Sequence, residues 1–479
     1  MKRFHLLPAS LLAILMLSGS PMFAGTVSLD SCRNMAVRNN KAIKIAQENV
    51  RGAGYLNKAA KAAYLPGIDF TGGYMYNQHE ISLLGEDAKL PTLSFDPATA
   101  SFKPNILVGP NGKPVVDPKT GQMIPTQVAV IPKEAMQYDV HNVFAGAFTL
   151  TQPVYMGGTI RAMNQITKYA ERFAQSMHNS AIQDVIFSVD EAYWQVVSLR
   201  EKKKLAESFV ELVDSLRRNV TEMYKEGVAT RSDELNVEVK YNEACIALTK
   251  VDNGLTLSRM NLARICGLPV DSDIDPEEEN VAEAQGAVPD YSLSEAVASR
   301  PDLDAVRQSI SVLESREKLS LGAMLPKIVA VGAWGFSNPN VIDGFEKKFG
   351  GGFSVGATLS VPIWHWGGNY NKLRAAKSNT AAQRLMLEDL EEKVDLQLSQ
   401  AKFSMQEAYK TYEMTENNLT AAGQNLKNAE IGFSEGVMTA DDVLKAQTAW
   451  LQAHSEYIDA QIGLRLCRTY LAKVAGKLL

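Results

Sequence analysis

Four short segments of the chain alternate apolar residues with small or polar ones. They cover residues 66–76, 143–153, 327–336 and 353–362. Even positions from 68 to 76 are apolar or aromatic apart from Gly72, and odd positions from 353 to 361 are apolar. A period of two predicts β-strands, and about ten residues is the length that a membrane-spanning strand needs. A soluble sheet with one wet face has the same alternation, so the pattern leaves both interpretations open.

Two longer segments, residues 158–266 and 369–476, carry a helical pattern. From Gly158 to Tyr224 the chain contains no proline, and apolar residues recur three or four positions apart. This stripe is typical of coiled-coil-like helices. About 66 residues at 1.5 Å each predict a rod of roughly 100 Å. We expect a long antiparallel helical hairpin in each segment.

Each hairpin turns at a similar sequence. In the first, Gly227 ends the outgoing helix, because glycine easily adopts the left-handed conformation of a helix end. Thr230 is a suitable N-cap for the returning helix, and Asp233 follows three residues later. Neither turn has the Glu or Gln of a full capping box. We therefore expect only the hydroxyl to bind a first-turn amide, with the carboxylate favouring the positive helix end.

The chain contains an internal repeat at an offset of 209 residues. YKEGVATRSD pairs with FSEGVMTADD, and LTQPVYMGG pairs with LSVPIWHWGG. The pairs include Gly227 with Gly436, Thr230 with Thr439, Asp233 with Asp442 and Pro153 with Pro362. We predict two repeats, over about residues 28–270 and 291–479, joined by an acidic linker at 271–290.

Composition excludes several classes of protein. Hydrophobic residues make up 46% and charged residues 22% of the chain, which excludes a disordered protein. Only one stretch approaches the length of an apolar helical span, which excludes a polytopic helical membrane protein. A net charge of −5 gives no reason to expect a nucleic-acid partner. The sequence lacks a nucleophile elbow, a phosphate-binding glycine loop, HExxH and CxxC. We expect no enzyme activity, no catalytic residue, no cofactor and no metal site.

The one long apolar stretch lies at the N-terminus. Lys2 and Arg3 precede the apolar run Leu6–Leu17, and Ala24 offers a small residue for cleavage. Residues 1–24 therefore predict a secretory signal peptide and an exported protein. An uncleaved membrane anchor is the alternative. No cysteine lies at the cleavage point, so we expect no lipid anchor.

The four cysteines are scattered along the chain. An even number in an exported protein permits disulfides, but the spacing assigns no pair. We favour the interpretation that they are small buried hydrophobic residues on helices. They are Cys32, Cys245, Cys266 and Cys467.

Four strands are too few to close a barrel in a membrane. An open sheet leaves unpaired backbone groups in hydrocarbon, which is prohibitively costly. Three copies of the chain supply twelve strands, an even number within the range of outer-membrane barrels. If the strands cross a membrane, we therefore expect an α+β membrane protein. It would be a homotrimer with a 12-stranded β-barrel, four strands per chain, continued by a coiled-coil α-helical barrel.

At the strand exits and hairpin turns the chain resembles the TolC-type outer-membrane efflux family. The resemblance rests on LTQPVYMGG, LSVPIWHWGG and the two EGV turns, and it covers essentially the whole mature chain. It implies a trimeric channel-tunnel in the bacterial outer membrane, with its helices in the periplasm, that passively conducts substrates in efflux or type I secretion. It also implies a periplasmic adaptor and an inner-membrane pump of RND, ABC or MFS type as partners. A periplasmic or surface coiled-coil scaffold without a channel is the alternative.

By this resemblance, the helical tips meet the hairpins of the adaptor. The tip residues are Gly227, Val228, Ala229 and Thr230 in the first hairpin, and Gly436, Val437, Met438 and Thr439 in the second.

The resemblance also implies a periplasmic gate near these turns, closed in the family by inward carboxylates and a Tyr–Arg–Asp clasp. Asp233 and Asp442 match two of the carboxylates. Phe433 stands at the tyrosine position, Met438 at the arginine position and Lys445 at that of a ring aspartate. A phenyl ring and a thioether cannot make the hydrogen bonds of the clasp. We therefore expect a closed state held by packing and other polar contacts. Lys445 either alters cation selectivity or lies on a solvated helix face.

Residues 77–142 form a long insert between the first two strands. It contains eight prolines between Pro91 and Pro132, together with NGK and DPKTG turn signals. We expect a loop that faces the cell exterior. It is either a passive ordered loop, or a cap or binding site for surface glycans or phage.

Overall fold

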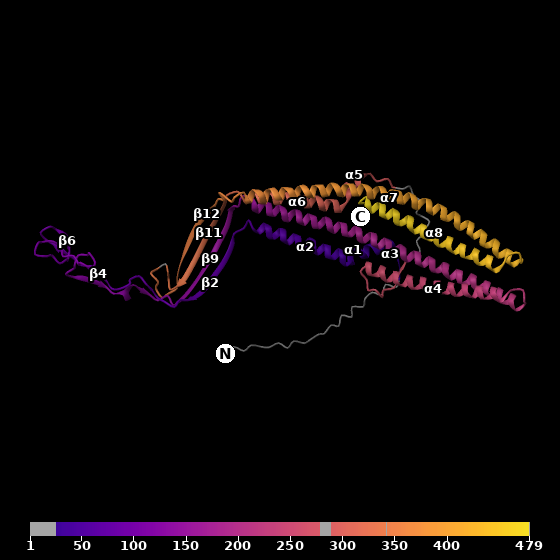
Figure 1. The fold of residues 1–479 in the computed structure, drawn as a ribbon, viewed down its shortest axis with the longest axis horizontal. Coiled ribbons are helices and arrows are strands. Elements are labelled where there is room, and N and C mark those ends of the chain that lie inside the picture. Colours follow the sequence, from indigo (N-terminus) through magenta and orange to yellow (C-terminus); the bar gives the residue numbers. More distant parts are fainter. Residues whose placement is uncertain (1–24, 278–288, 342, 479) are drawn as a thin grey trace, which may run out of the picture. The chain divides into compact units, whose positions relative to one another are not determined.

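The chain forms two compact units, drawn in Figure 1. The computed structural model describes residues 25–277, 289–341 and 343–478, so the predicted signal peptide lies outside the described residues. Among the described residues, the helical unit comprises 25–58, 162–277, 289–317 and 372–478, and the sheet unit comprises 59–161, 318–341 and 343–371. Within the described ranges, no helix has both the length and the apolar character that a transmembrane span requires.

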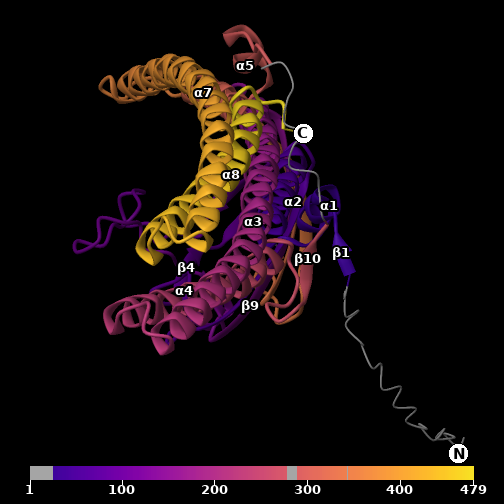
Figure 2. The ribbon, with the colours of Figure 1, turned by 90° about the vertical axis from the view of Figure 1, so that its right-hand side faces the viewer.

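The helical unit is built mainly from two long antiparallel hairpins (Figures 1 and 2). In the first, α3 (Thr159–Lys225) is followed by α4 (Arg231–Ile265). In the second, α7 (Gly368–Ser434) is followed by α8 (Ala440–Val474). Both outgoing helices have 67 residues and both returning helices have 35. An uninterrupted helix of that size is about 100 Å long, as the proline-free pattern predicts.

Shorter helices precede each pair of long strands in chain order. They are α1 (Leu29–Asn39), α2 (Lys41–Ala62), α5 (Leu293–Ser299) and α6 (Pro301–Gly322). Helix α1 is tied to α3 by Arg33, which donates hydrogen bonds of 2.7 and 2.5 Å to the two carboxylate oxygens of Asp190. Because Asp190 is fully buried, this bidentate pair fixes the position of α1 on α3.

The core of the helical unit follows the apolar stripes. Near the turns, one cluster, here called the tip core, joins all four long helices. Its buried members are Phe209, Val213, Leu216 and Val220 of α3, Val237 and Ala244 of α4, Leu426 and Ala429 of α7, and Val443 and Ala446 of α8. The two hairpins therefore pack against one another near their tips.

The segment predicted as a linker, residues 271–290, contains a short strand. Strand β10 (Ile274–Pro276) pairs in parallel with β1 (Gly25–Val27). Arg200 of α3 donates a hydrogen bond of 2.6 Å to the last carbonyl of β10. The linker prediction is therefore corrected for these residues, whereas 278–288 lie outside the described residues. Strand β10 was not predicted because three residues are too few to show an alternation. Its partner β1 also lies far from it along the chain, at the start of the first repeat.

The sheet unit contains a four-stranded antiparallel sheet in the order β12–β11–β9–β2. Its strands are β2 (Gly67–Tyr76), β9 (Asn142–Tyr155), β11 (Lys327–Asn338) and β12 (Gly350–Ser360). The first three begin and end within two residues of the positions that the alternation predicts. Strand β12 begins three residues earlier than predicted, because three glycines continue the ladder with β11.

The two prolines paired by the repeat have different surroundings. Pro153 lies inside β9 opposite Val329, where the register with β11 shifts after Ile328. Pro362 lies beyond the end of β12. Proline removes a ladder hydrogen bond and is tolerated at irregularities of this kind. One repeated motif therefore continues a central strand in the first copy and follows an outer strand in the second.

The long insert between β2 and β9 contains strands that the loop prediction missed. Strand β3 (Ile81–Ser82) pairs with β8 (Gln137–Tyr138), β4 (Ala88–Pro91) with β7 (Val128–Ile131), and β5 (Leu93–Asp96) with β6 (Ser101–Pro104). A 3₁₀ turn, η1 (Lys133–Met136), precedes β8. Pro91 and Pro104 each end a strand, where a missing amide is tolerated. Proline density therefore did not exclude short pairings here.

Candidate functional site

The predicted tip residues of the first hairpin, 227–230, form the turn between α3 and α4. Gly227 has a φ of 73°, in the left-handed region that favours glycine. The amides of Val228 and Ala229 donate to the Met223 carbonyl oxygen at 2.9 and 3.2 Å. These bonds satisfy a carbonyl that the end of α3 leaves without a helical partner.

The predicted tip residues of the second hairpin, 436–439, form an equivalent turn between α7 and α8. Gly436 also has a φ of 73°. The amides of Val437 and Met438 donate to the Gly432 carbonyl oxygen at 2.8 and 3.0 Å. The two tips, which Figure 2 shows facing the viewer, therefore share one backbone hydrogen-bonding pattern.

Both returning helices begin with a complete capping box, which corrects the expectation of a one-sided cap. The Asp233 amide donates to Thr230 Oγ1 at 3.2 Å, and Asp233 Oδ2 accepts from the Thr230 amide at 2.9 Å. Thr439 and Asp442 repeat these bonds at 3.3 and 3.0 Å. In both turns the threonine hydroxyl also lies within hydrogen-bond distance of the carboxylate, at 2.6 and 2.7 Å. An aspartate is thus long enough to bind back to the N-cap amide.

The capping bonds favour the ionised form of both aspartates. Hydrogen bonds from the Thr230 hydroxyl and amide lower the pKa of Asp233 below its ordinary value. Thr439 does the same to the pKa of Asp442, to which the charge of Lys445 adds a smaller effect. Both carboxylates are therefore ionised at neutral pH, at the positive ends of α4 and α8.

Each tip also exposes apolar surface. Val228 is 71% exposed and Val437 is 80% exposed, and the Met438 side chain is 40% exposed. Branched side chains on backbone-bonded turns lose little conformational freedom when a partner covers them. The tips can therefore bind another protein through apolar contact.

A cleft of about 610 Å³ lies between α3 and the second hairpin. Leu216, Met223, Phe433 and Val443 supply much of its apolar lining. Phe433 is half-buried and packs against the tip core, as does Ala229 of the first turn. Gln447 also lines this cleft; it is 2% exposed, and its Oε1 has no hydrogen-bond partner among the described residues. The sequence did not predict a role for Gln447, because the helical stripe marks only apolar positions.

Met438 packs on the backbone of α7. A Cβ atom built on Gly432 would lie only 2.9 Å from Met438 Sδ, so the thioether occupies space that any side chain at this position would fill. Van der Waals contact therefore holds Met438 against Gly432, the residue before Phe433, near the position where the resemblance implied a polar clasp.

Lys445 lies on the exposed surface of α8. Its Nζ is 2.7 Å from Asp441 Oδ2, one helical turn earlier, and the two side chains are 71% and 68% exposed. Exposed pairs of this kind contribute little to stability, because water screens the charges. In the single chain Lys445 has the environment of a solvated helix residue.

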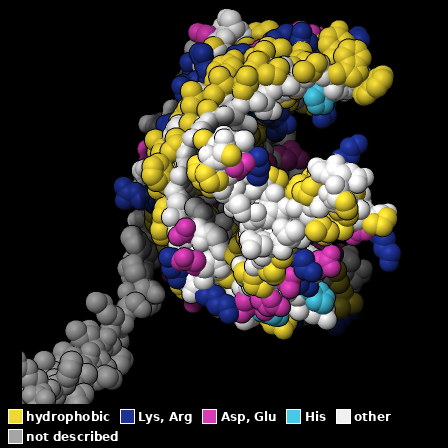
Figure 3. Space-filling view, turned by 90° about the vertical axis from the view of Figure 1, so that its left-hand side faces the viewer, with side chains coloured by type: hydrophobic (Ala, Val, Ile, Leu, Met, Phe, Trp, Pro, Cys, Tyr) yellow, Lys and Arg dark blue, Asp and Glu magenta, His cyan; other side chains and the backbone are white. Residues whose placement is uncertain are grey.

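The four-stranded sheet presents an apolar face. Its register aligns Phe70 with Phe148, Phe148 with Trp334 and Trp334 with Phe353, which gives an aromatic row across all four strands. Of these four side chains, Phe353 is 83% exposed and Phe148 is 46% exposed. Figure 3 shows hydrophobic side chains gathered in broad areas on the surface that it faces. Exposed apolar areas of this kind mark surfaces that are covered in the working protein.

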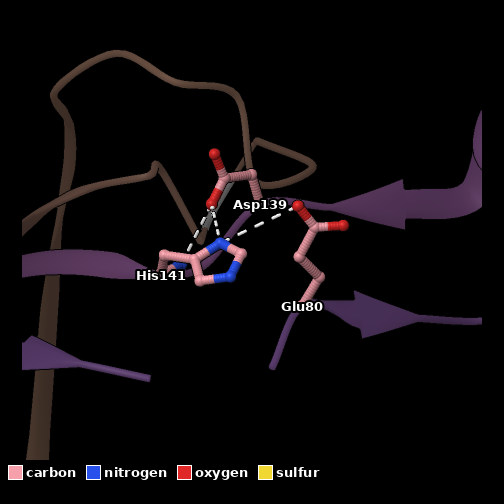
Figure 4. Close-up of side chains that lie close together, drawn as sticks. All are labelled: Glu80, Asp139 and His141. Carbon is pink, nitrogen blue, oxygen red and sulfur yellow. Dashed lines mark hydrogen bonds and ion pairs between the residues drawn. The ribbon is translucent and has the colours of Figure 1, made fainter. Parts of the chain in front are cut away.

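Three potential metal ligands, Glu80, Asp139 and His141, lie together at the base of the long insert (Figure 4). His141 Nδ1 is 2.8 Å from Asp139 Oδ1 and 3.7 Å from Glu80 Oε1. The Lys347 ammonium contacts the other Asp139 oxygen at 2.5 Å and, with His141, lowers the pKa of that carboxyl well below its usual range. Lys347 thus ties the insert to the β11–β12 loop by an ion pair. The sequence did not predict this group, because Glu80 lies far along the chain from Asp139 and His141.

The chain is similar to outer membrane efflux proteins in sequence. A family model described as outer membrane efflux protein matches residues 126–268 and 292–477. The outer membrane efflux protein BepC of Brucella suis biovar 1 is 21% identical over 296 residues. That alignment covers 62% of this chain and 64% of BepC, so it spans less than two thirds of the relative's length.

Solved structures share the fold over nearly the whole chain. The outer membrane channel CmeC of Campylobacter jejuni has a TM-score of 0.72 at 15% identity, covering 94% of this chain and 86% of CmeC. The outer membrane protein VceC of Vibrio cholerae has a TM-score of 0.71 at 13% identity, covering 94% of this chain and 97% of VceC. The chain therefore has the fold of these outer membrane proteins.

Proposed function

This chain belongs to the outer membrane efflux protein family, and we propose that it forms the outer-membrane channel-tunnel of a tripartite efflux or type I secretion system. It would passively conduct substrates from an inner-membrane pump and a periplasmic adaptor to the cell exterior. The resemblance seen in the sequence is confirmed by the family match. The family and the fold are those of channel proteins rather than of enzymes.

The exposed apolar face of the sheet is the observation that carries this proposal. Strands β2 and β12 are the two outer strands. In hydrocarbon their unpaired backbone groups must find partners. We propose that β2 of one copy pairs with β12 of the next, so that three chains close a barrel of twelve strands, within the range of outer-membrane barrels. The long hairpins would then form a periplasmic α-helical barrel.

The domain plan follows from the same proposal. We propose that residues 1–24 are removed on export, and that repeats at about 28–270 and 291–479 each supply two barrel strands and one helical hairpin. The paired turns support this duplication, because both have the same glycine conformation and the same capping box.

A soluble coiled-coil scaffold fits the sheet less well. In a soluble sheet, the apolar face would pack against another layer. Here Phe353 is 83% exposed and Val355 is 80% exposed on that face. Lipid accounts for this exposure without a further layer of protein. We therefore favour the channel over the scaffold.

We propose that residues 227–230 and 436–439 bind the periplasmic adaptor. The exposed Val228 and Val437 support this role, because they offer apolar contact at the crown of capped turns. The cleft beneath the second turn adds a place for a partner side chain. The adaptor in turn would connect the channel to a pump of RND, ABC or MFS type.

We propose that Asp233, Phe433, Asp442 and Lys445 surround the periplasmic gate, and that packing closes it. Both aspartates are already bonded to the threonine of their own capping box, which leaves them as a charged rim rather than as clasp partners. Phe433 packs on the tip core, which supports an apolar closure. The insert 77–142 would face the cell exterior.

Membrane extraction tests the proposal. Outer membranes carrying the chain are washed with carbonate and then dissolved in detergent, and the mass of the extracted particle is measured by light scattering. We expect the chain to stay with the membranes and to elute as a trimer. Release by carbonate as a soluble particle would contradict the channel and favour the scaffold.

A further inference from the structure

Two cysteines from distant parts of the chain are buried next to each other. Cys32 lies in α1, and Cys266 is the C-cap residue of α4. Both are 0% exposed and belong to one hydrophobic cluster. Cys266 Sγ lies 3.7 Å from the Cys32 carbonyl oxygen, and a hydrogen bond between the two thiols lowers the pKa of Cys266. The Cys266 thiol thus lies against Cys32 in a sealed apolar site.

The backbone around these thiols is held in close contact. Asn40 Nδ2 donates a hydrogen bond of 2.8 Å to the Ile265 carbonyl oxygen. A Cβ built on Gly267 would lie 2.6 Å from Asn39 Cβ, so the ends of α1 and α4 touch without intervening side chains. A disulfide requires Cα atoms about 4.4–6.8 Å apart. Asn39 lies seven residues after Cys32, so this contact holds the end of α1, while the 3.7 Å contact of Cys266 Sγ with the Cys32 carbonyl oxygen brings Cys266 to the Cys32 backbone.

We propose that Cys32 and Cys266 form a disulfide bond in the exported protein. The inference rests on the proposed outer-membrane location, because the chain then folds in the periplasm, where disulfides form and persist. Such a bond would link α1, which precedes the first barrel strand in the chain, to the end of the first hairpin. It would act together with the Arg33–Asp190 ion pair, which holds α1 on α3.

The chemistry needs an oxidant, which we assign to the class of periplasmic thiol–disulfide oxidoreductases. One cysteine thiolate attacks the disulfide of the oxidant and expels one of its sulfurs as a thiolate. The second cysteine then attacks the mixed disulfide, which forms the Cys32–Cys266 bond and releases the oxidant as a dithiol. Two electrons and two protons pass to the oxidant. Because both sulfurs are sealed in the folded chain, the exchange takes place during folding.

The other two cysteines provide an internal control. Cys245 on α4 and Cys467 on α8 are only partly buried. Cys245 lies beside Tyr241, and burial raises the pKa of the Cys467 thiol. We expect both to remain thiols.

Counting thiols in the full-length protein tests the proposal. The chain is extracted from outer membranes without reductant, unfolded in the presence of N-ethylmaleimide, then reduced and treated with iodoacetamide. We expect maleimide on Cys245 and Cys467, and iodoacetamide only on Cys32 and Cys266, with a linked peptide in the unreduced digest. Maleimide on all four cysteines of the outer-membrane protein would overturn the disulfide while leaving the channel intact. Absence of the chain from outer membranes would instead contradict the proposed function.

Two double variants make the assignment specific. C245S/C467S should retain the linked peptide, whereas C32A/C266A should lose it. In limited trypsin digestion, C32A/C266A should be cleaved after Arg33 and Arg38 several-fold faster than C245S/C467S, because α1 detaches more easily. Equal cleavage rates, with the linked peptide absent from C245S/C467S, would overturn the proposal.

Discussion

Asp233 and Asp442 are the residues whose chemistry the structure defines most closely. Each completes a capping box and carries a pKa below its ordinary value because of hydrogen bonds from its threonine. A group with a lowered pKa in the folded state stabilises that state above the unfolded pKa, which is about 3.9 for aspartate. This stability is lost as the pH falls through the lower folded value. The tips should therefore loosen in acid.

Replacing Asp442 by alanine should loosen the second tip at neutral pH. The substitution removes the carboxylate that accepts from the Thr439 amide and contacts its hydroxyl, whereas the residue 442 amide still donates to Thr439 Oγ1. We expect the first-turn amides of α8 to exchange several-fold faster when they open locally. The measurement is hydrogen exchange with mass spectrometry, corrected for intrinsic rates, at several pH values. The difference from the wild type should shrink as the pH falls below the folded pKa.

Asp441→Ala is the matched control for this prediction. Asp441 precedes Asp442 and pairs only with the exposed Lys445 among the contacts described here. Its removal should leave the exchange rates almost unchanged. Equal effects of the two substitutions would show that the capping box does not stabilise the turn.

Phe433 tests the packed gate. Phe433→Ala removes the ring from the tip core, and should cost about 2 kcal/mol or less because the ring is only half-buried. We expect a larger resting conductance in a planar bilayer. Phe403→Ala is the control, since Phe403 is 70% exposed on the same helix. An unchanged conductance in Phe433→Ala would contradict closure by packing.

At the scale of elements, substitutions in β12 distinguish an outer-membrane channel from a soluble scaffold. Val355 lies on the apolar face of the sheet and Ser354 on the other. A lysine on a lipid-facing strand position costs about 2–4 kcal/mol near the bilayer midplane, whereas a position facing the lumen tolerates charge. Val355→Lys should therefore greatly reduce the amount of chain assembled in the outer membrane, and Ser354→Lys should not. Western blots of membrane fractions measure both, and equal assembly of the two variants would refute a lipid-facing side.

A second prediction concerns the ion pair that holds helix α1 on α3. Asp190 is fully buried, and its removal leaves Arg33 without its buried partner. Arg33 is itself 31% exposed and also pairs with Asp30, so the loss is smaller than the roughly 3–5 kcal/mol of a fully buried pair. Asp190→Ala should speed tryptic cleavage within α1, while Asp184→Ala should not, because the Asp184 side chain that pairs with Lys473 is 61% exposed. Similar digestion of both variants would show that the ion pair does not hold α1.

The elements that the sequence predicts well are those in which a regular pattern continues over many residues. The strands β2, β9 and β11 alternate over at least ten residues, and α3 and α7 keep an apolar stripe without proline, so their positions follow from the pattern. Strands of two to four residues in the insert, and β1 with β10, are too short to carry a period. The Glu80–Asp139–His141 group, Gln447 and the Cys32–Cys266 contact depend on tertiary packing. The tip residues came from the resemblance and the repeat, and their role stays a prediction.

At the scale of the whole molecule, one chain leaves much of its surface without a protein partner. The sheet has two outer strands and an exposed apolar face, and the tips expose valines. In an outer-membrane trimer, neighbouring copies would pair with the outer strands, lipid would cover the apolar face, and an adaptor would cover the valines. These surfaces therefore belong to one assembly, whose purpose would be to conduct substrates outward.

Single-channel recording on the detergent-purified protein in a planar bilayer tests that purpose most directly. We predict discrete conductance steps from a particle of trimeric mass, small in the wild type and larger in Phe433→Ala. A purified protein that inserts into the bilayer but conducts in neither form, or that never inserts, would contradict the channel.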